Sequence, residues 1–260
     1  MKYIDIHSHL GFEDYGEDRS KVIKRMHDAH VGTIAIGADL ESSKEAVRVA
    51  TDNENVWACI GMHPNHNQTE VFDTKKYEEL IKNPKVVAVG ECGLEYFKLT
   101  GEIDKIKAKQ KVDFIKQVEL AIKYDKPLML HIRDGEARGE AYEDVYNILK
   151  GYEGKIKGNV HFFAGTLEWA KNFIELGFTI SFTGLITYVH DFDKIIKTVS
   201  LENLQAETDA PFVSPVPHRG TRNEPVNVGY VYQKIAEIRG EDPELVRLQL
   251  LENAGRVFDI

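Results

Sequence analysis

The sequence predicts an α/β protein: a single-domain (β/α)8 TIM barrel over residues 1–260, with its active site at the C-terminal face of the strands. Three observations predict this fold. Short apolar segments alternate with amphipathic ones along the chain, a pattern typical of parallel strands covered by helices. About eight strand–helix pairs can be counted, which favours closure into a barrel over an open sheet. The length of 260 residues, without a fixed-period repeat, a low-complexity run or a linker, suits one such barrel.

The individual elements follow in order from the side-chain pattern. Strands are predicted where short apolar runs are rich in β-branched residues, and helices where apolar residues recur at helical spacing. The longest helix ends at Asp125-Lys126-Pro127, and the last one begins with Asp242 as its N-cap and Pro243 at its first position. The predicted strands are residues 4–9, 33–36, 55–60, 85–90, 128–131, 158–162, 178–182 and 204–207. The predicted helices are residues 19–30, 41–51, 74–82, 102–123, 142–149, 167–176, 192–199 and two segments within 224–260.

Composition narrows the functional class. The formal net charge of −9 argues against a broad surface for duplex nucleic acid. A small site for a nucleic-acid end stays open, because bound metal ions can supply positive charge locally. Cys59 and Cys92 lie in or beside apolar runs and are predicted to be buried thiols in a reducing cytosol. Neither a secretory signal nor an apolar run long enough for a membrane span is present, so we expect a soluble, cytoplasmic protein.

The N-terminal strand ends in two candidate metal ligands. Side chains alternate along an extended chain, so His7 and His9 should face the same way, with Asp5 in line behind them. Neutral imidazole is a preferred ligand of zinc and other first-row ions. The alternative is that one histidine caps the strand and the other is a surface residue.

Further polar residues follow other predicted strands, at positions that open onto one face of a parallel barrel. We therefore expect a set of four imidazoles and two carboxylates to converge, namely His7, His9, Glu91, His131, His161 and Asp209. This set exceeds the needs of one four-coordinate ion, whereas two ions that share a bridging carboxylate would use all of it. The alternative makes each member a hydrogen-bonded core or loop residue.

Seven motifs, in order along nearly the whole chain, resemble those of the TatD-type metal-dependent deoxyribonucleases, within the wider amidohydrolase-like barrels. They are Asp5-Ile6-His7-Ser8-His9-Leu10, Gly61-Met62-His63-Pro64, Gly90-Glu91-Cys92-Gly93-Leu94, His131-Ile132-Arg133-Asp134, His161-Phe162-Phe163-Ala164-Gly165, Glu207-Thr208-Asp209-Ala210-Pro211 and Arg222-Asn223-Glu224-Pro225. The resemblance implies that His7 and His9 hold one ion, that His131 and His161 hold the second, that Glu91 bridges them, and that Asp209 completes the first site. It also implies hydrolysis of DNA phosphodiesters, often from a 3′ end.

The chain departs from that family at the rim of the expected site. Members commonly have Gly-Leu-Asp-Tyr-Tyr where this chain has Gly93-Leu94-Glu95-Tyr96-Phe97. They often have histidine after the His-Pro pair, where this chain has Asn65 followed by His66. Neither change touches a proposed metal ligand, so substrate specificity is less determined than reaction type.

The expected mechanism uses two divalent cations (zinc, manganese or magnesium) and a metal-bound hydroxide as nucleophile. Asp209 is the candidate proton acceptor, with Glu91 as the bridging carboxylate. His63 could donate to a phosphate oxygen, or only stabilise the loop beside Pro64. Arg133 suits bidentate phosphate contact, with an ion pair to Asp134 or Glu136 as the alternative.

Two further features concern the substrate. Arg222, like Arg219, lies in a polar loop on the expected active face, where it binds phosphate or is merely solvated. Aromatic residues near strand ends can stack on unpaired bases, and we expect one or two of them to do so. These residues are Tyr96, Phe97, Phe162, Phe163, Tyr188 and Phe212.

The leading hypothesis is thus a 3′–5′ exonuclease acting on single-stranded or frayed DNA, with neither a membrane partner nor an obligate protein partner. A hydrolase of small amides, esters or phosphoesters that uses the same metal pair is the enzyme alternative. Glu91 stands where a carbamylated lysine would be needed, which disfavours a lactonase-like enzyme. A catalytically weak scaffold is disfavoured because it would leave the ligand set unexplained.

Overall fold

Eight parallel strands form one sheet in simple chain order, from β1 to β8. The computed structural model describes residues 1–68 and 70–260. The order and direction confirm the predicted (β/α)8 barrel, because strand–helix units that all wind the same way bring each strand beside the one before it. The strands are β1 (Tyr3–Ser8), β2 (Val31–Ile36), β3 (Val56–Ile60), β4 (Val86–Glu95), β5 (Leu128–Arg133), β6 (Gly158–Val160), β7 (Phe178–Phe182) and β8 (Leu204–Ala206).

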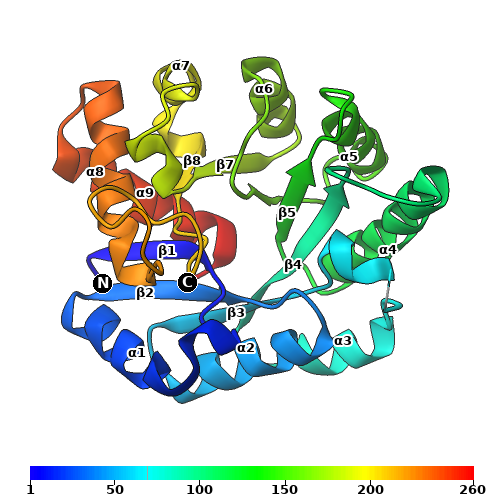
Figure 1. Cartoon of the computed structure of the whole chain (residues 1–260), viewed down its shortest axis with the longest axis horizontal. Helices are drawn as coiled ribbons and strands as arrows, with labels where there is room; N and C mark the ends of the chain where they lie inside the picture. Colours follow the sequence, from blue (N-terminus) through cyan, green and yellow to red (C-terminus); the bar gives the residue numbers. More distant parts are fainter. Residues whose placement is uncertain (69) are drawn as a thin grey trace.

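Helices surround the strands on the outside of the barrel (Figure 1). Among the described residues, eight helices (α1 to α8) each follow the strand of the same number, and α9 is additional. They are α1 (Arg19–Asp28), α2 (Leu40–Asp52), α3 (Thr74–Leu80), α4 (Ile103–Lys123), α5 (Glu140–Lys150), α6 (Leu167–Glu175), α7 (Asp193–Thr198), α8 (Val228–Arg239) and α9 (Pro243–Phe258). Short 3₁₀ helices, which the sequence did not predict, are η1 (Glu13–Asp18), η2 (Pro64–Gln68), η3 (Gly184–Thr187), η4 (Leu201–Asn203) and η5 (Pro225–Asn227).

The hydrophobic core has two parts, because successive residues of each strand face opposite sides of the sheet. The outer part packs strand residues such as Leu128 and Leu130 against the ring of helices. The inner part contains the alternate residue Met129 together with Ile34 and Ile36. The end of α9 contributes Phe258 to this inner cluster, so α9 helps to close the barrel interior.

The barrel closes where its first and last strands meet. The backbone N–H of Asp209 donates to the carbonyl of His7 at 3.0 Å, and that of His9 donates to the carbonyl of Ala210 at 2.7 Å. Near the start of β1, the hydroxyl of Tyr232 from α8 donates to the Ile4 carbonyl at 3.0 Å and accepts from the Ile4 N–H at 3.3 Å. A helix side chain therefore satisfies backbone groups of β1 that a neighbouring strand would otherwise take.

Strand boundaries near the C-terminal face differ from the predicted ones. β4 runs on to Glu95, so Glu91 lies within a strand instead of following one. β6 and β8 end at Val160 and Ala206, before the predicted ends. The residues that matter for the site are thus held partly by strands and partly by the turns that leave them.

β1 also departs from strict alternation. Its register against β2 shifts between Asp5 and Ser8, and such an irregularity changes which side chains share a face. The carboxylate of Asp5 accepts hydrogen bonds from the N–H and hydroxyl of Thr208, at 2.9 and 2.5 Å. Asp5 therefore ties the two ends of the barrel sheet together. The expected alternation is interrupted between Asp5 and Ser8, although His7 and His9 both present Nε2 to the same oxygen of Glu91.

Within residues 1–68 and 70–260, no helix combines the length and the apolar character that a membrane crossing requires.

Candidate metal centre and catalytic cavity

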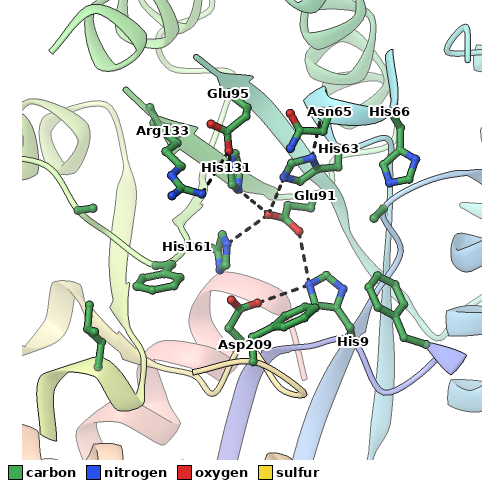
Figure 2. A pocket seen from close by; sticks show the side chains of 17 residues that line it. His9, His63, Asn65, His66, Glu91, Glu95, His131, Arg133, His161 and Asp209 are labelled. Carbon is green, nitrogen blue, oxygen red and sulfur yellow. Dashed lines mark hydrogen bonds and ion pairs between the residues drawn. The ribbon is translucent and has the colours of Figure 1, made fainter. Parts of the chain in front are cut away.

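A cavity of about 700 Å³ opens at the C-terminal ends of the strands. Its walls are largely apolar and include Phe12, Ile132, Phe162, Leu185 and Phe212. Its floor is formed by ionisable side chains that point toward one another (Figure 2), namely His9, His63, Glu91, His131, His161 and Asp209. His7 is fully buried below them. The structure thus brings together all six side chains that the sequence assigned to metal ions.

Glu91, from β4, lies at the centre of this group (Figure 2), and its two carboxylate oxygens face different histidines. Oε2 lies 3.6 Å from His7 Nε2 and 3.7 Å from His9 Nε2. Oε1 lies 2.7 Å from His131 Nδ1 and 3.2 Å from His161 Nε2. Burial alone would raise the pKa of Glu91, but the surrounding imidazoles outweigh it and hold the pKa well below its ordinary value. Glu91 is therefore ionised and oriented as a bridging carboxylate would be.

The first group of candidate ligands comes from the two ends of the sheet. Asp209 Oδ1 lies 3.5 Å from His9 Nε2 and 3.7 Å from His7 Nε2. These separations are long for hydrogen bonds. They are close to the roughly 3.4 Å between neighbouring ligand atoms of a tetrahedral ion with bonds of about 2.1 Å.

The histidines of this group also have the free nitrogens that a metal ion needs. Both ring nitrogens of His7 are buried and make no hydrogen bond within the described part of the chain, which is costly unless another group binds them. His9 Nδ1 lies 3.4 Å from the carbonyl of Ile36. If the proton resides on Nδ1, the lone pair of Nε2 is left for a ligand. The first group thus fits a divalent cation.

The second group is more compact. His131 Nδ1 bonds directly to Glu91 at 2.7 Å, so an ion here would have to replace that hydrogen bond. His131 Nε2 lies 3.0 Å from Glu95 Oε2. Although burial opposes it, the carboxylates of Glu207 and Glu91 raise the pKa of His161 well above its ordinary value. This group therefore holds protons that a cation would displace.

His63 is held by the turn into η2. Its Nδ1 accepts a hydrogen bond from the N–H of Asn65 at 3.1 Å, and burial followed by the charge of His131 lowers the pKa of His63 well below its ordinary value. A neutral imidazole that accepts at Nδ1 carries its proton on Nε2. This nitrogen lies 3.6 Å from Glu91 Oε1. His63 thus both stabilises its loop and offers an N–H donor to the cavity.

The candidate ligands overlap around Glu91. Their donor atoms form three groups in which every atom lies within 4.8 Å of the others: His7, Glu91 and His161; His7, His9 and Asp209; His63, Glu91 and His131. His63 therefore lies beside the candidate ligands, but with Nδ1 accepting from Asn65 and the proton on Nε2 it serves as a hydrogen-bond donor and not as a metal ligand.

Arg133 lines the cavity wall and is largely exposed. Its guanidinium lies 4.0 Å from the ring centre of Phe97 and 3.9 Å from Glu95 Oε2. Asp134, the expected alternative partner, instead accepts hydrogen bonds from the N–H groups of Gly139 and Ala141 at the start of α5. Arg133 is therefore placed to meet an anion that enters the cavity.

Arg222 is not brought to the cavity. Its guanidinium pairs with Asp18 at 2.7 Å, lies 3.5 Å from Glu224, and rests 4.8 Å from the ring centre of Tyr15. Asp18 is 204 residues away in sequence, so local sequence could not reveal this pairing. The geometry does not support the predicted contact between Arg222 and substrate.

Only some of the aromatic residues that were predicted to stack on unpaired bases lie at the cavity. Phe162 and Phe212 line the cavity, whereas Tyr96 and Phe163 are buried in the core.

Sequence reasoning assigned no role to two carboxylates that contact the candidate ligands. Glu95 accepts from His131, as described above. Glu207 is fully buried and lies 3.2 Å from His161 Nδ1. The available signal was an acidic residue in an apolar strand end close to a ligand motif, since a buried carboxylate needs partners.

Comparison with known proteins gives consistent matches over the whole chain. Residues 4–259 match the family described as TatD related DNase. The uncharacterized metal-dependent hydrolase YabD of Bacillus subtilis is 35% identical over 98% of this chain and 98% of its own length. A 3′-5′ ssDNA/RNA exonuclease TatD of Shigella flexneri is 29% identical over 98% of each chain. The crystal structure of YJJV, a TatD homologue from Escherichia coli K12, superposes with a TM-score of 0.89 at 28% identity, covering 100% of this chain and 98% of that one.

Proposed function

This chain belongs to the TatD related DNase family, and from that premise we propose that it is a 3′–5′ exonuclease that hydrolyses single-stranded or frayed DNA with two divalent cations. Its relatives and family make it a metal-dependent hydrolase. The 3′-5′ ssDNA/RNA exonuclease activity for which the Shigella flexneri relative is named supports the substrate and the polarity. The proposed cations are zinc, manganese or magnesium, all of which accept mixed imidazole and carboxylate ligands or phosphate.

The observation that carries the proposal is the orientation of Glu91. One of its oxygens faces His7 and His9, and the other faces His131 and His161. A carboxylate that serves two imidazole sets is the arrangement that a pair of ions requires, and two ions suit phosphodiester chemistry. We assign His7, His9 and Asp209 to the first ion, His131 and His161 to the second, and Glu91 to both.

The protein side chains then have separate tasks. When bound, the divalent cations lower the pKa of water and offset the charge that develops on the phosphate. Asp209 borders the cavity, and the neighbouring imidazoles of His9, His161 and His7 outweigh the effect of burial, so the pKa of Asp209 is lowered and its carboxylate is ionised. It accepts the proton of the attacking water. His63 donates from Nε2 to a phosphate oxygen, and Arg133 binds phosphate at the wall.

The cavity supports a strand end as the substrate. Its volume of about 700 Å³ lies in the range of pockets for small ligands, and Phe162 and Phe212 offer apolar ring surface to a base. The net charge of −9 provides little attraction for a long duplex. The proposal also places the protein in the cytoplasm, where the buried thiols of Cys59 and Cys92 would stay unpaired.

The test uses metal-depleted protein reloaded with one cation at a time. It is incubated with single-stranded DNA labelled at the 3′ or the 5′ end, with labelled RNA, with a blunt duplex, and with small amide and ester substrates. We expect immediate release of labelled mononucleotide from the 3′-labelled strand and a shortening ladder from the 5′-labelled strand. The blunt duplex should react more slowly than the single strand.

Two variants make the result specific to this protein. Glu91→Gln should abolish cleavage, which excludes a contaminating nuclease. His190→Ala, which changes an exposed histidine paired with Asp193 outside the cavity, should cleave at the normal rate. Release of the 5′ label first would reverse the proposed polarity. Hydrolysis of small esters without any cleavage of nucleic acid would replace the proposal with the small-molecule alternative.

A further inference from the structure

Glu207, in the turn that leaves β8, lies behind two of the candidate metal ligands. Its carboxylate is fully buried. Oε1 lies 3.2 Å and Oε2 lies 3.3 Å from His161 Nδ1. Oε2 also lies 3.9 Å from His7 Nδ1. One carboxylate therefore faces the rear nitrogens of two different histidines.

These two histidines are placed as a pair. The rings of His7 and His161 stack with their centres 3.7 Å apart and an angle of 13° between their planes. In both rings Nε2 faces Glu91 and Nδ1 faces Glu207. In the proposed assignment His7 serves the first ion and His161 serves the second. Glu207 thus lies behind a ligand of each ion site, within hydrogen-bond distance of His161 and 3.9 Å from His7 Nδ1.

The backbone holds Glu207 firmly in this position. Its N–H donates to the carbonyl of Phe182 on β7 at 3.1 Å. Its Oε1 accepts from the N–H of Phe162 at 2.6 Å. Phe162 has a φ of +44°, which is unfavourable for a residue with a side chain. This turn directs the N–H that follows His161 toward the carboxylate, so the local conformation serves the contact with Glu207.

The remaining ligand histidines have separate supports. His9 Nδ1 faces the backbone carbonyl of Ile36. His131 Nε2 faces Glu95, which also accepts from the N–H of Phe97 at 2.9 Å. Glu95 therefore supports one ligand of one site, and this difference gives a matched comparison for Glu207.

We propose that Glu207 is a positioning residue that supports both ion sites at once, an inference that rests on the two-ion function proposed above. Its negative charge favours the proton on Nδ1 of both rings, through a hydrogen bond at His161 and electrostatically across 3.9 Å at His7, so that the lone pairs of both Nε2 atoms face the ions. Carboxylates that orient ligand histidines in this way typically contribute 10- to 100-fold to metal affinity. Removing the charge of Glu207 should weaken both ions together, whereas removing that of Glu95 should weaken one.

The test compares full-length wild type, Glu207→Gln and Glu95→Gln, each stripped of metal and titrated with Co²⁺ alone. Calorimetry and equilibrium dialysis give the number of ions and their affinities, and the visible absorption of Co²⁺ reports the ligands around each ion. We expect two ions in the wild type, a loss of about 10- to 100-fold in affinity for both ions in Glu207→Gln, and a loss for one ion in Glu95→Gln. A merely structural effect would lower the thermal midpoint without this pattern.

The outcomes separate the two proposals. A wild type that saturates at one Co²⁺ overturns the two-ion function. A wild type with two ions, together with a folded Glu207→Gln that loses affinity for one ion or for neither, overturns the role of Glu207 and leaves the two-ion function standing. If Glu207→Gln does not fold, Glu207→Asp decides the question. It keeps the charge on a shorter side chain, and it should weaken both ions by a smaller factor. Unchanged affinity in a folded Glu207→Asp would also overturn the role of Glu207.

Discussion

Replacing Asp209 by asparagine should lower kcat by roughly 10²-fold or more, the scale of positioned acid–base catalysis, while the fold stays intact. Asparagine nearly preserves the shape but removes the negative charge and the ability to accept a proton. The backbone of Asp209 is held by main-chain bonds to His7 and from Phe212, which the substitution does not touch. Its φ of +54° lies in the left-handed region, which asparagine tolerates well. The loss therefore concerns catalysis, and it corresponds to about 2.7 kcal/mol of transition-state stabilisation.

The assay for Asp209→Asn is single-turnover cleavage of end-labelled single-stranded DNA, with enzyme in excess and the metal content measured on the same sample. Circular dichroism and the thermal midpoint show whether the variant is folded. His190→Ala serves as the matched control. A folded Asp209→Asn enzyme that retains its ions and turns over at a near-normal rate would remove Asp209 from the mechanism. The proton would then have to pass to Glu91 or to bulk solvent.

Three further predictions follow from particular contacts. Tyr232→Phe removes the hydroxyl that bonds to both backbone groups of Ile4, so urea unfolding should show a loss of about 1–3 kcal/mol in the free energy of unfolding, with normal activity per folded molecule. Because the pKa of His161 is raised in the metal-free protein, a cation must displace a proton there. Metal affinity should therefore rise with pH until that pKa is passed, and calorimetry in buffers of different ionisation enthalpy should detect proton release; a pH-independent affinity would contradict this. Arg133→Ala should raise KM roughly tenfold with little change in kcat, since a hydrogen bond to a charged group is worth about 1.5 kcal/mol; the exposed Arg138→Ala is its control, and an unchanged KM would exclude the phosphate contact.

The sequence alone could predict the barrel and the convergence of its six candidate ligands, because both depend on repeated local patterns. His131 and Asp209 follow apolar strands, and parallel strands in a barrel deliver such residues to one face. The irregular register around Asp5 could not be predicted, since alternation assumes a regular strand. The pairing of Arg222 with Asp18 joins residues far apart in sequence, and no local pattern encodes it.

The contacts of Glu95 and Glu207 with the candidate ligand histidines could not be predicted from the sequence, for a related reason. A glutamate at a strand end can face solvent, a helix or the barrel interior, and only the packed structure decides among these. Glu207 is buried because His161 and the N–H of Phe162 lie opposite it. Both partners come from a different strand–helix unit. Ligand motifs are thus visible in sequence, whereas the residues that orient the ligands are visible only in three dimensions.

The joining of β1 to the segment after β8 sets the order in which the centre can be built during protein synthesis. Of the six candidate ligands, His7 and His9 leave the ribosome first and Asp209 leaves last, although these three lie in the same group. A growing chain shorter than 209 residues lacks the carboxylate of Asp209 and the N–H that it donates to His7. Because domains fold as units as they emerge, the complete ligand set exists only once the segment that carries Asp209 has been made. A chain released before Asp209 therefore lacks the full set of candidate ligands, and under the proposed function such a chain would not cleave nucleic acid.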